Sequence, residues 1–257
     1  MSDLAADPKP RVSVAIPCYN EAAAIATVVA SWREVLPEAE VVVFDNNSRD
    51  GTGSIAREAG ARVVEVPLQG KGHAVRSIFS ELVDRDAVIL VDGDGTYPAD
   101  EIGPMLAAVL DGSIDMAVGA RRPTEEAGAM TALRGLGNVL IRGAFRVLIG
   151  KSAGDLLSGY RVFSRRFLSA VSLRSEGFEI ETELASEAVA LKLPTREFPV
   201  PYRPRIAGTT SKLNAFRDGA RILKTIVAQS LRLRPWRPIL LALVTLAIIA
   251  GIVKVLT

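Results

Sequence analysis

The chain is predicted to form an α/β domain with a mainly parallel sheet covered by helices, followed by a membrane anchor. Three observations support this: strand-like and helix-like segments alternate, polar clusters follow the strand-like runs, and residues 239–253 are all apolar or small. Such alternation is typical of parallel sheets. We expect a polar tail at 1–10, a main domain at 11–211, an amphipathic helix at 212–234 and an anchor at 235–257.

Five strands are expected where short β-branched or apolar runs end at turn formers. They span 12–16, 40–44, 62–66, 87–91 and 116–118. Helices are expected between them, where apolar residues recur at helical spacing or a segment ends at glycine. They span 21–36, 54–60, 74–83 and 101–110. Because ligands of such sheets bind beyond the carboxyl ends of the strands, the loops after the first, second and fourth strands are expected to form one site.

Composition excludes several classes of protein. With 257 residues, 49% hydrophobic and 23% charged, the chain is not disordered. A net charge of only +2 argues against wrapping nucleic acid. Cys18 is the only cysteine and His73 the only histidine, so the chain has no internal disulfide and no Cys/His zinc cluster.

The two ends of the chain predict its location. Residues 1–10 lack the apolar core of a signal peptide, so the main domain is expected in the cytoplasm. Residues 239–253 are just long enough for a membrane span, and a buried core helix is the alternative. Three arginines and Trp236 crowd the near edge, which is typical of a cytoplasmic-side anchor. We therefore expect a membrane protein with a cytoplasmic domain, whose lone span leaves homo-oligomers possible.

Two acidic positions follow expected strands. Asp92 and Asp94 come directly after the strand at 87–91. Carboxylates so close repel each other, and a divalent cation relieves this repulsion while leaving positions for phosphate oxygens. The alternative is a solvated Asp-Gly turn. Asp45, after the strand at 40–44, is suited to a base N–H or a ribose hydroxyl.

A short Gly-Lys-Gly segment carries one positive charge. Residues 70–72 are expected to form a flexible loop in which Lys71 meets a diphosphate or a sugar, or else a plain surface turn. The chain has no G-x-G-x-x-G after its first strand and no G-x-x-x-x-G-K-[ST], which disfavours dinucleotide-binding and P-loop proteins.

Four motifs together resemble family-2 glycosyltransferases of the GT-A fold. They are Val-Ala-Ile-Pro-Cys-Tyr-Asn-Glu ending at Glu21, Asp-Asn-Asn-Ser-Arg-Asp-Gly-Thr from Asp45, the Gly-Lys-Gly of Lys71, and Asp-Gly-Asp-Gly-Thr-Tyr-Pro from Asp92. Two later segments, 155–161 and 208–213, are similar to polyprenyl-phosphate glycosyltransferases, the group of the dolichyl-phosphate mannose and glucose synthases. The resemblance covers nearly the whole chain and implies a GT-A catalytic domain over 11–211.

The resemblance implies roles for individual residues. Those expected to hold the donor nucleotide are Pro17, Tyr19, Glu21, Asp45, Lys71, Asp92 and Arg121. Asp92 and Asp94 would hold Mg²⁺ or Mn²⁺ on the donor diphosphate, and Thr96 stands where some relatives supply a further ligand, although a hydroxyl binds metal more weakly. Arg121 and Arg161 would face phosphates, and Ser158 with Gly159 would shape the same wall.

An acidic segment, residues 178–184, resembles the start of the helix where hydroxyl-using members carry their catalytic base. Glu181 or Glu183 is therefore a candidate base, or orients basic groups near the acceptor. Acidic residues also simply suit a helix N-terminus. Asp94 and Arg161 complete the expected catalytic set.

Two basic amphipathic helices are expected to face the membrane. Five residues are expected at the acceptor phosphate or the membrane face: Ser158, Ser211, Lys212, Arg217 and Arg221. In the helix that follows Lys212, a helical wheel places basic residues on one arc and mainly apolar residues on the opposite arc. The arcs are Arg217, Arg221 and Lys224 against Phe216, Leu223, Ile226, Val227 and Ser230. A second such helix is expected at about 132–149. Helices of this kind lie among lipid headgroups, although a solvated helix packed on the domain is the alternative.

The predicted function is an inverting, metal-dependent transfer of one sugar from a nucleotide donor to polyprenyl phosphate. A phosphate monoester, with a second pKa of about 6, is already mostly dianionic and needs no base. A UDP-sugar is mildly preferred, since Asp45 suits uracil, but a GDP-sugar is possible. The alternatives are a transferase acting on a hydroxyl acceptor and a non-catalytic nucleotide-binding membrane adaptor.

Overall fold

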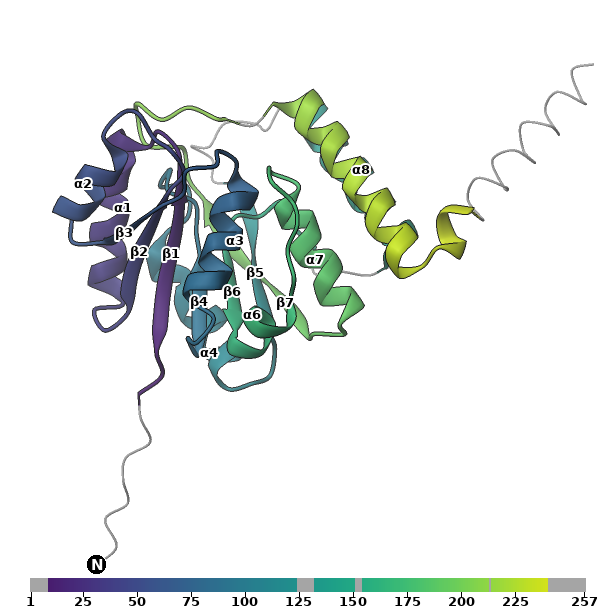
Figure 1. The fold of residues 1–257 in the computed structure, drawn as a ribbon, viewed down its shortest axis with the longest axis horizontal. Coiled ribbons are helices and arrows are strands. Elements are labelled where there is room, and N and C mark those ends of the chain that lie inside the picture. The colour runs from purple at the N-terminus through teal and green to yellow at the C-terminus, as the bar shows by residue number, and fades with distance from the viewer. Residues whose placement is uncertain (1–8, 124–131, 151–153, 213, 240–257) are drawn as a thin grey trace, which may run out of the picture.

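A seven-stranded sheet forms the centre of the molecule (Figure 1). The computed structural model describes residues 9–123, 132–150, 154–212 and 214–239. The strands are β1 Val12–Cys18, β2 Glu40–Asp45, β3 Arg62–Glu65, β4 Ala87–Leu90, β5 Met116–Pro123, β6 Arg161–Ser164 and β7 Thr195–Tyr202. Their order is β3-β2-β1-β4-β6-β5-β7, and only β6 runs antiparallel to its neighbours. The predicted mainly parallel sheet is confirmed.

Helices fill the connections between strands. They are α1 Ala22–Val35, α2 Thr52–Glu58, α3 Lys71–Glu81, η1 Ala99–Ile102, α4 Gly103–Leu110, α5 Ala132–Leu148, α6 Arg165–Ala170, α7 Ile180–Ala190 and α8 Ala215–Leu233. Within the described residues, the five strands expected from the sequence and the helices expected up to residue 234 are present within a few residues. The helix expected at 101–110 begins earlier as the 3-10 turn η1, and α4 follows with proline in its first turn. Strands β6 and β7 were not predicted.

Two apolar layers cover the sheet. On one face, α1, α2 and α4 enclose a cluster in which Trp32 packs with Ile16 of β1. On the other face, α3, α6 and α7 enclose a second cluster that contains Ile78 and Phe167. Full burial of a large apolar side chain stabilises a fold by about 1.5–3 kcal/mol. These layers fix the strands, and therefore the loops at their carboxyl ends.

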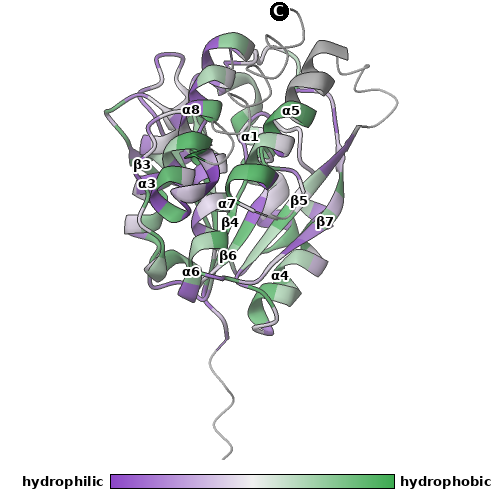
Figure 2. Ribbon diagram, turned by 90° about the vertical axis from the view of Figure 1, so that its right-hand side faces the viewer, coloured by the Kyte–Doolittle hydropathy of each residue, from purple (hydrophilic) through white to green (hydrophobic). Residues whose placement is uncertain are grey.

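A third layer lies outside α7. Helices α5 and α8 pack on it through a cluster that includes Phe145, Ala185 and Ile226. Figure 1 shows α8 lying beyond α7, away from the sheet, and Figure 2 shows α5 and α8 together. Helix α7 therefore has the sheet on one side and α8 on the other.

Helix α8 has three faces instead of the two arcs expected. Its inner face is buried: Asp218, Ile222, Ile226 and Ser230. An apolar stripe stays exposed: Phe216, Leu223, Val227 and Leu231. The third face is basic and exposed: Arg217, Arg221 and Lys224. The placement of Ile226 and Ser230 with the outward apolar arc was wrong, because these two side chains pack onto the domain.

The expected membrane anchor lies mostly outside the described part of the chain. It was placed at 235–257, and residues 240–257 are not described. Among the helices that are described, none has both the length and the apolar character needed to cross a bilayer. Most of the polar tail at 1–10 also lies outside the described residues.

Candidate active site

The carboxyl ends of three neighbouring strands bring the predicted acidic motifs together. Strand β1 lies between β2 and β4, and the amide of Asn46, just after β2, donates to the carbonyl of Cys18 at the end of β1 (2.8 Å). Asp92 follows β4 closely. Charged residues of these loops meet others from α3, α7 and the segment after β7. We call this group the carboxyl-edge cluster: Glu21, Lys71, Asp92, Asp94, Glu181, Arg205 and Lys212.

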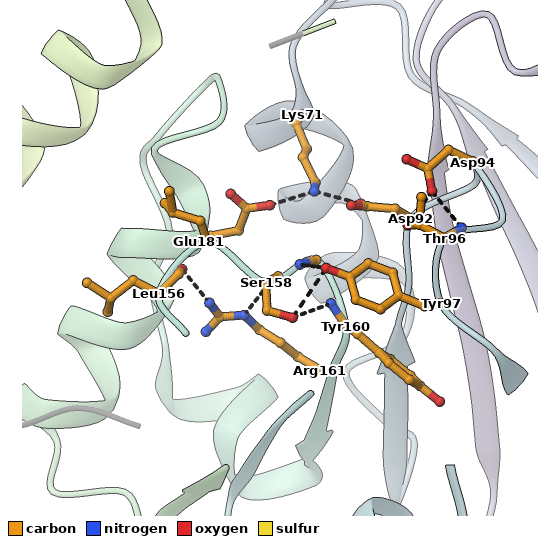
Figure 3. A network of polar contacts seen from close by, with 12 residues as sticks. Lys71, Asp92, Asp94, Thr96, Tyr97, Leu156, Ser158, Tyr160, Arg161 and Glu181 are labelled. Atoms are coloured by element: carbon orange, nitrogen blue, oxygen red, sulfur yellow. Dashed lines mark hydrogen bonds and ion pairs between the residues drawn. The ribbon is translucent and has the colours of Figure 1, made fainter. Parts of the chain in front are cut away.

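Lys71 joins two carboxylates. Its Nζ lies 2.6 Å from Asp92 Oδ1 and 2.6 Å from Glu181 Oε1 (Figure 3). Burial alone would lower the pKa of Lys71, but the two carboxylates outweigh it and raise the pKa. Lys71 was expected in a flexible loop, and this was wrong: it is the first residue of α3 and only 11% of its side chain is exposed.

Tight backbone packing holds the start of α3 in place. The amide of Gly72 donates to the carbonyl of Glu176 (2.9 Å), and a Cβ on Gly72 would lie 2.2 Å from the carbonyl oxygen of Ser175. Gly70 adopts a φ of +143°, a conformation that favours glycine. The two glycines that flank Lys71 therefore allow the loop at 174–177 to press against it.

The two candidate glutamates of α7 point to different partners. Glu181 contacts Lys71, and its pKa is raised by burial and by the nearby charge of Asp92, which Lys71 offsets only in part. Glu183 instead accepts the amides of Arg174 (3.1 Å) and Ser175 (2.7 Å). Glu181 is thus part of the cluster, whereas Glu183, also expected as a candidate base, fixes the loop that covers Lys71.

Both carboxylate oxygens of Asp94 are engaged. Oδ1 accepts the amide (3.0 Å) and the hydroxyl (2.7 Å) of Thr96, and Oδ2 lies 2.5 Å from the guanidinium of Arg205. Thr96 therefore orients Asp94. Arg205 was not predicted; the one signal for it was its place just before the motif at 208–213.

Glu21 pairs with a lysine that was assigned elsewhere. Its Oε1 lies 2.8 Å from Nζ of Lys212, which also donates to the carbonyl of Asn20 (2.9 Å). The other oxygen, Oε2, is buried without a hydrogen-bond partner in the described structure, and burial raises the pKa of this carboxyl. Lys212 was expected on the membrane face, and the structure instead places it against Glu21.

The other predicted donor residues lie along the same edge. Pro17 is the penultimate residue of β1, and Tyr19 follows that strand; both are half-buried. Asp45 ends β2 and accepts the amide of Ser48 (3.0 Å). Sequence reasoning missed the position of Asn46, whose buried side chain accepts the amide of Gly70 (2.6 Å) and so ties β2 to the start of α3.

Two arginines that were expected to face phosphates have partners within the protein. Arg121 forms a two-pronged ion pair with Asp155 (2.7 and 2.8 Å). Arg161 is 1% exposed, and its guanidinium donates to the carbonyls of Leu156 (2.8 Å) and Ser158 (3.0 Å). Burial lowers the pKa of Arg161. The sequence could not reveal that Arg161 is enclosed by its own preceding turn.

The wall beside Asp92 is built by the turn that precedes β6. The hydroxyl of Ser158 is buried and donates to the carbonyl of Gly119 (2.5 Å), so Ser158 supports the wall from inside. A Cβ on Gly159 would lie 2.2 Å from a carboxylate oxygen of Asp92. Within this turn it is Gly159 that lies against the carboxylate of Asp92. In contrast, Ser211, Arg217 and Arg221 are exposed outside this cluster.

The donor set suits a hard divalent cation in part. Asp92 and Asp94 offer carboxylate oxygens, the ligands that Mg²⁺ and Mn²⁺ prefer. Within the described ranges no group of three or more His, Cys, Asp or Glu side chains is placed to hold a metal. The residues present fit a cation that takes two protein carboxylates and its other ligands from phosphate and water.

Comparison with known proteins identifies relatives in sequence. The family model described as "Glycosyl transferase family 2" matches residues 13–171. Glycosyltransferase AglJ of Haloferax volcanii is 40% identical over 211 residues, covering 82% of this chain and 69% of that protein. A dolichyl-phosphate hexose transferase of the same organism is 34% identical over 216 residues, covering 84% of this chain and 92% of that protein.

A solved structure shows the same fold. Glucosyl-3-phosphoglycerate synthase of Mycobacterium tuberculosis, in complex with Mn²⁺, uridine diphosphate and phosphoglyceric acid, superposes with a TM-score of 0.68. It is 22% identical, and the match covers 87% of this chain and 78% of that one. The GT-A fold expected from the sequence is therefore confirmed.

Proposed function

The chain belongs to glycosyl transferase family 2 and is a nucleotide-sugar glycosyltransferase, and we propose that it transfers a single sugar to a polyprenyl phosphate at the cytoplasmic face of a membrane. One observation carries this proposal. Glu181 of α7 lies in the carboxyl-edge cluster, and α8, with its exposed apolar stripe and basic face, packs on the same helix. The charged site is thus one helix away from a surface suited to lipid.

The donor side of the proposed reaction uses the acidic edge. Asp92 and Asp94 would hold Mg²⁺ or Mn²⁺, which when bound neutralises charge on the diphosphate leaving group. Glu21 and Asp45 lie at the ends of the neighbouring strands, where they would bind the nucleoside. A UDP-sugar is the preferred donor and a GDP-sugar the alternative.

The acceptor side needs no strong base. A phosphate oxygen of the lipid attacks the anomeric carbon, the bond from that carbon to the diphosphate breaks, and the nucleoside diphosphate leaves with the electron pair. A direct displacement of this kind inverts the anomeric configuration. Because a phosphate monoester is mostly dianionic at neutral pH, no proton has to be removed. Lys71 and Glu181 are then free to position groups instead of moving a proton.

The membrane part of the proposal rests on α8 and α5. Four large apolar side chains of α8 are exposed, Phe216 by 83%, and Val139 and Leu140 of α5 are exposed by 65% and 62%. Exposed apolar surface flanked by arginines is typical of helices at a lipid headgroup layer. The relative named dolichyl-phosphate hexose transferase supports a lipid phosphate as acceptor. The anchor at 235–257 is proposed from the sequence alone.

A labelled-donor assay tests the proposed function. The protein is incubated with radiolabelled UDP- and GDP-sugars, Mn²⁺, and vesicles carrying undecaprenyl or dolichyl phosphate. We expect label in a lipid product that mild acid releases, because a glycosyl phosphate is acid-labile. Label found only in an acid-stable glycoside would favour the hydroxyl acceptor, and no turnover of any donor would favour the non-catalytic adaptor.

A further inference from the structure

Residues 203–212, which we call the strap, run from the end of β7 across the carboxyl edge of the sheet. The amide of Arg203 donates to the carbonyl of Thr96 (2.9 Å), and the amide of Ile206 to the carbonyl of Asp94 (3.3 Å). The first half of the strap therefore follows the turn that carries the proposed metal ligands.

Two ion pairs hold the strap at its two ends. Arg205 pairs with Asp94 (2.5 Å), and Lys212 pairs with Glu21 (2.8 Å). Between them, the hydrogen bonds of Thr209 stay within the strap. Ile206 also packs against the apolar cluster of the domain, so opening of the strap has to break this contact and the backbone hydrogen bond to Asp94 as well as the pair at Arg205.

The pair at Asp94 occupies an oxygen that a cation would use. Asp94 Oδ1 already accepts two hydrogen bonds from Thr96, and Arg205 occupies Oδ2. The side chain of Asp94 is only 5% exposed, and both of its oxygens are engaged. A guanidinium and a divalent cation would also repel each other at this distance. Arg205 and a cation would therefore compete for Asp94.

We propose that the strap is a latch that a divalent cation opens. In the closed state Arg205 neutralises Asp94. A cation held by Asp94 would displace Arg205, and the strap would then leave the edge by breaking the hydrogen bond from Ile206 to Asp94, while the pair of Lys212 with Glu21 keeps it tethered. The inference rests on the metal site of the proposed function, and it adds that the protein supplies its own competitor for that site.

Binding of Mn²⁺ alone tests the latch, measured by calorimetry and electron paramagnetic resonance on the full chain. Arg205→Gln should bind Mn²⁺ about tenfold more tightly, equivalent to about 1.4 kcal/mol. The matched control is Arg203→Gln, which removes the same charge from the same exposed strap but has no ion pair with Asp94. It should change the affinity by less than about twofold, since its charge acts only through screened solvent.

Hydrogen exchange gives a second readout. Mn²⁺ should speed amide exchange in 206–212 of the wild type, while Arg205→Gln should show fast exchange there without metal. The latch would be overturned, but not the metal site, by either of two results. One is an equal gain in Mn²⁺ affinity for Arg205→Gln and Arg203→Gln; the other is amide exchange in the strap that does not change when Mn²⁺ is added. Failure of both the wild type and Arg205→Gln to bind Mn²⁺ would overturn the metal site together with the latch.

Discussion

The two edges of the sheet both carry ion pairs, but those pairs differ in burial. At the carboxyl edge, the side chains of Lys71 and Glu181 are 11% and 5% exposed. At the amino edge, those of Arg165 and Asp86 are 51% and 36% exposed. Exposed pairs contribute about 0–1 kcal/mol, whereas buried pairs often fail to repay the cost of removing two charges from water. The buried pairs of the carboxyl edge are therefore better explained by function than by stability.

At the amino edge, a surface hollow is lined by charged side chains that are already paired with one another. A hollow of about 890 Å³ lies there, lined by residues that include Arg11, Asp86 and Arg165. Arg165 pairs with Asp86 (2.8 Å), and Arg166 pairs with Asp115 (3.2 Å). Volume alone therefore does not mark the active site; the convergence of strand ends and buried carboxylates does.

Removal of Asp94 should have the largest effect. Asp94→Ala should lower kcat/KM for sugar transfer by at least about a hundredfold, the usual scale for losing one preorganised electrostatic group. The matched control at the amino edge, Asp84→Ala, should stay within about twofold, since exposed positions tolerate change. Undiminished turnover by Asp94→Ala with Mn²⁺ present would remove the functional contrast between the two edges.

Loss of the buried lysine at the carboxyl edge should lower the free energy of unfolding more than loss of an exposed arginine at the amino edge. Lys71→Met leaves Glu181 and Asp92 without their shared partner and should lower the free energy of unfolding by about 3 kcal/mol, measured by urea denaturation. Arg62→Met at the amino edge should cost only about 0–1 kcal/mol. The double variant Lys71→Met/Glu181→Met should recover part of the loss; equal costs for the two single variants would contradict the contrast.

The basic face of α8 should matter for membrane binding. Each arginine near an anionic surface contributes about 1 kcal/mol, so Arg217→Gln/Arg221→Gln should weaken vesicle binding about thirtyfold at low salt. The protein is used without residues 240–257, so that an anchor cannot mask the change. A matched pair at the amino edge, Arg62→Gln/Arg165→Gln, should bind as the wild type does. An equal loss of vesicle binding in both double variants would show that α8 carries no special membrane-binding surface.

The smallest effect expected is a pH dependence at the Arg121–Asp155 pair. Burial alone would raise the pKa of Asp155, but the hydrogen bonds and charge of Arg121 outweigh it, so the pKa lies below its ordinary 3.8. The folded state thus binds the proton less tightly than the unfolded chain does. The Arg121–Asp155 pair therefore stabilises the fold fully above pH 3.8. This stabilisation is lost as the pH falls through the pKa of Asp155 in the folded state.

The test of this pair is urea unfolding of the wild type and Asp155→Asn across pH. The variant should be less stable by about 2 kcal/mol at pH 7, the usual scale for a hydrogen-bonded charged group. The difference should shrink only below the ordinary pKa. If the difference in unfolding free energy between the wild type and Asp155→Asn grew as the pH fell, the predicted direction of the pH dependence would be wrong.

Much of the site was predictable because it follows buried strands. Asp45 ends β2, Asp92 and Asp94 lie two and four residues after the end of β4, and neighbouring parallel strands end at one edge. Helical spacing also indicates that Glu181 and Glu183, two residues apart, face different directions. It cannot indicate which of them meets Lys71, because that depends on how α7 packs between the sheet and α8.

Two parts of the fold escaped sequence reasoning for physical reasons. Strand β7 contains Pro199 and Pro201, which normally argue against a strand. It lies at the edge of the described sheet, where its neighbour is β5, so positions that face away from β5 need no ladder hydrogen bond. Arg205 follows β7 and meets Asp94 more than a hundred residues away in the chain, a contact that no local pattern encodes.

The most direct test compares two acceptors that differ in one group. Polyprenyl phosphate and the corresponding polyprenol are placed in identical anionic vesicles with the same labelled donor and Mn²⁺, and the initial rates of transfer are measured. The account predicts transfer to the phosphate and none above the Asp94→Ala background to the alcohol. Faster transfer to the alcohol would contradict it, because that reaction requires a base where the structure holds Glu181 against Lys71.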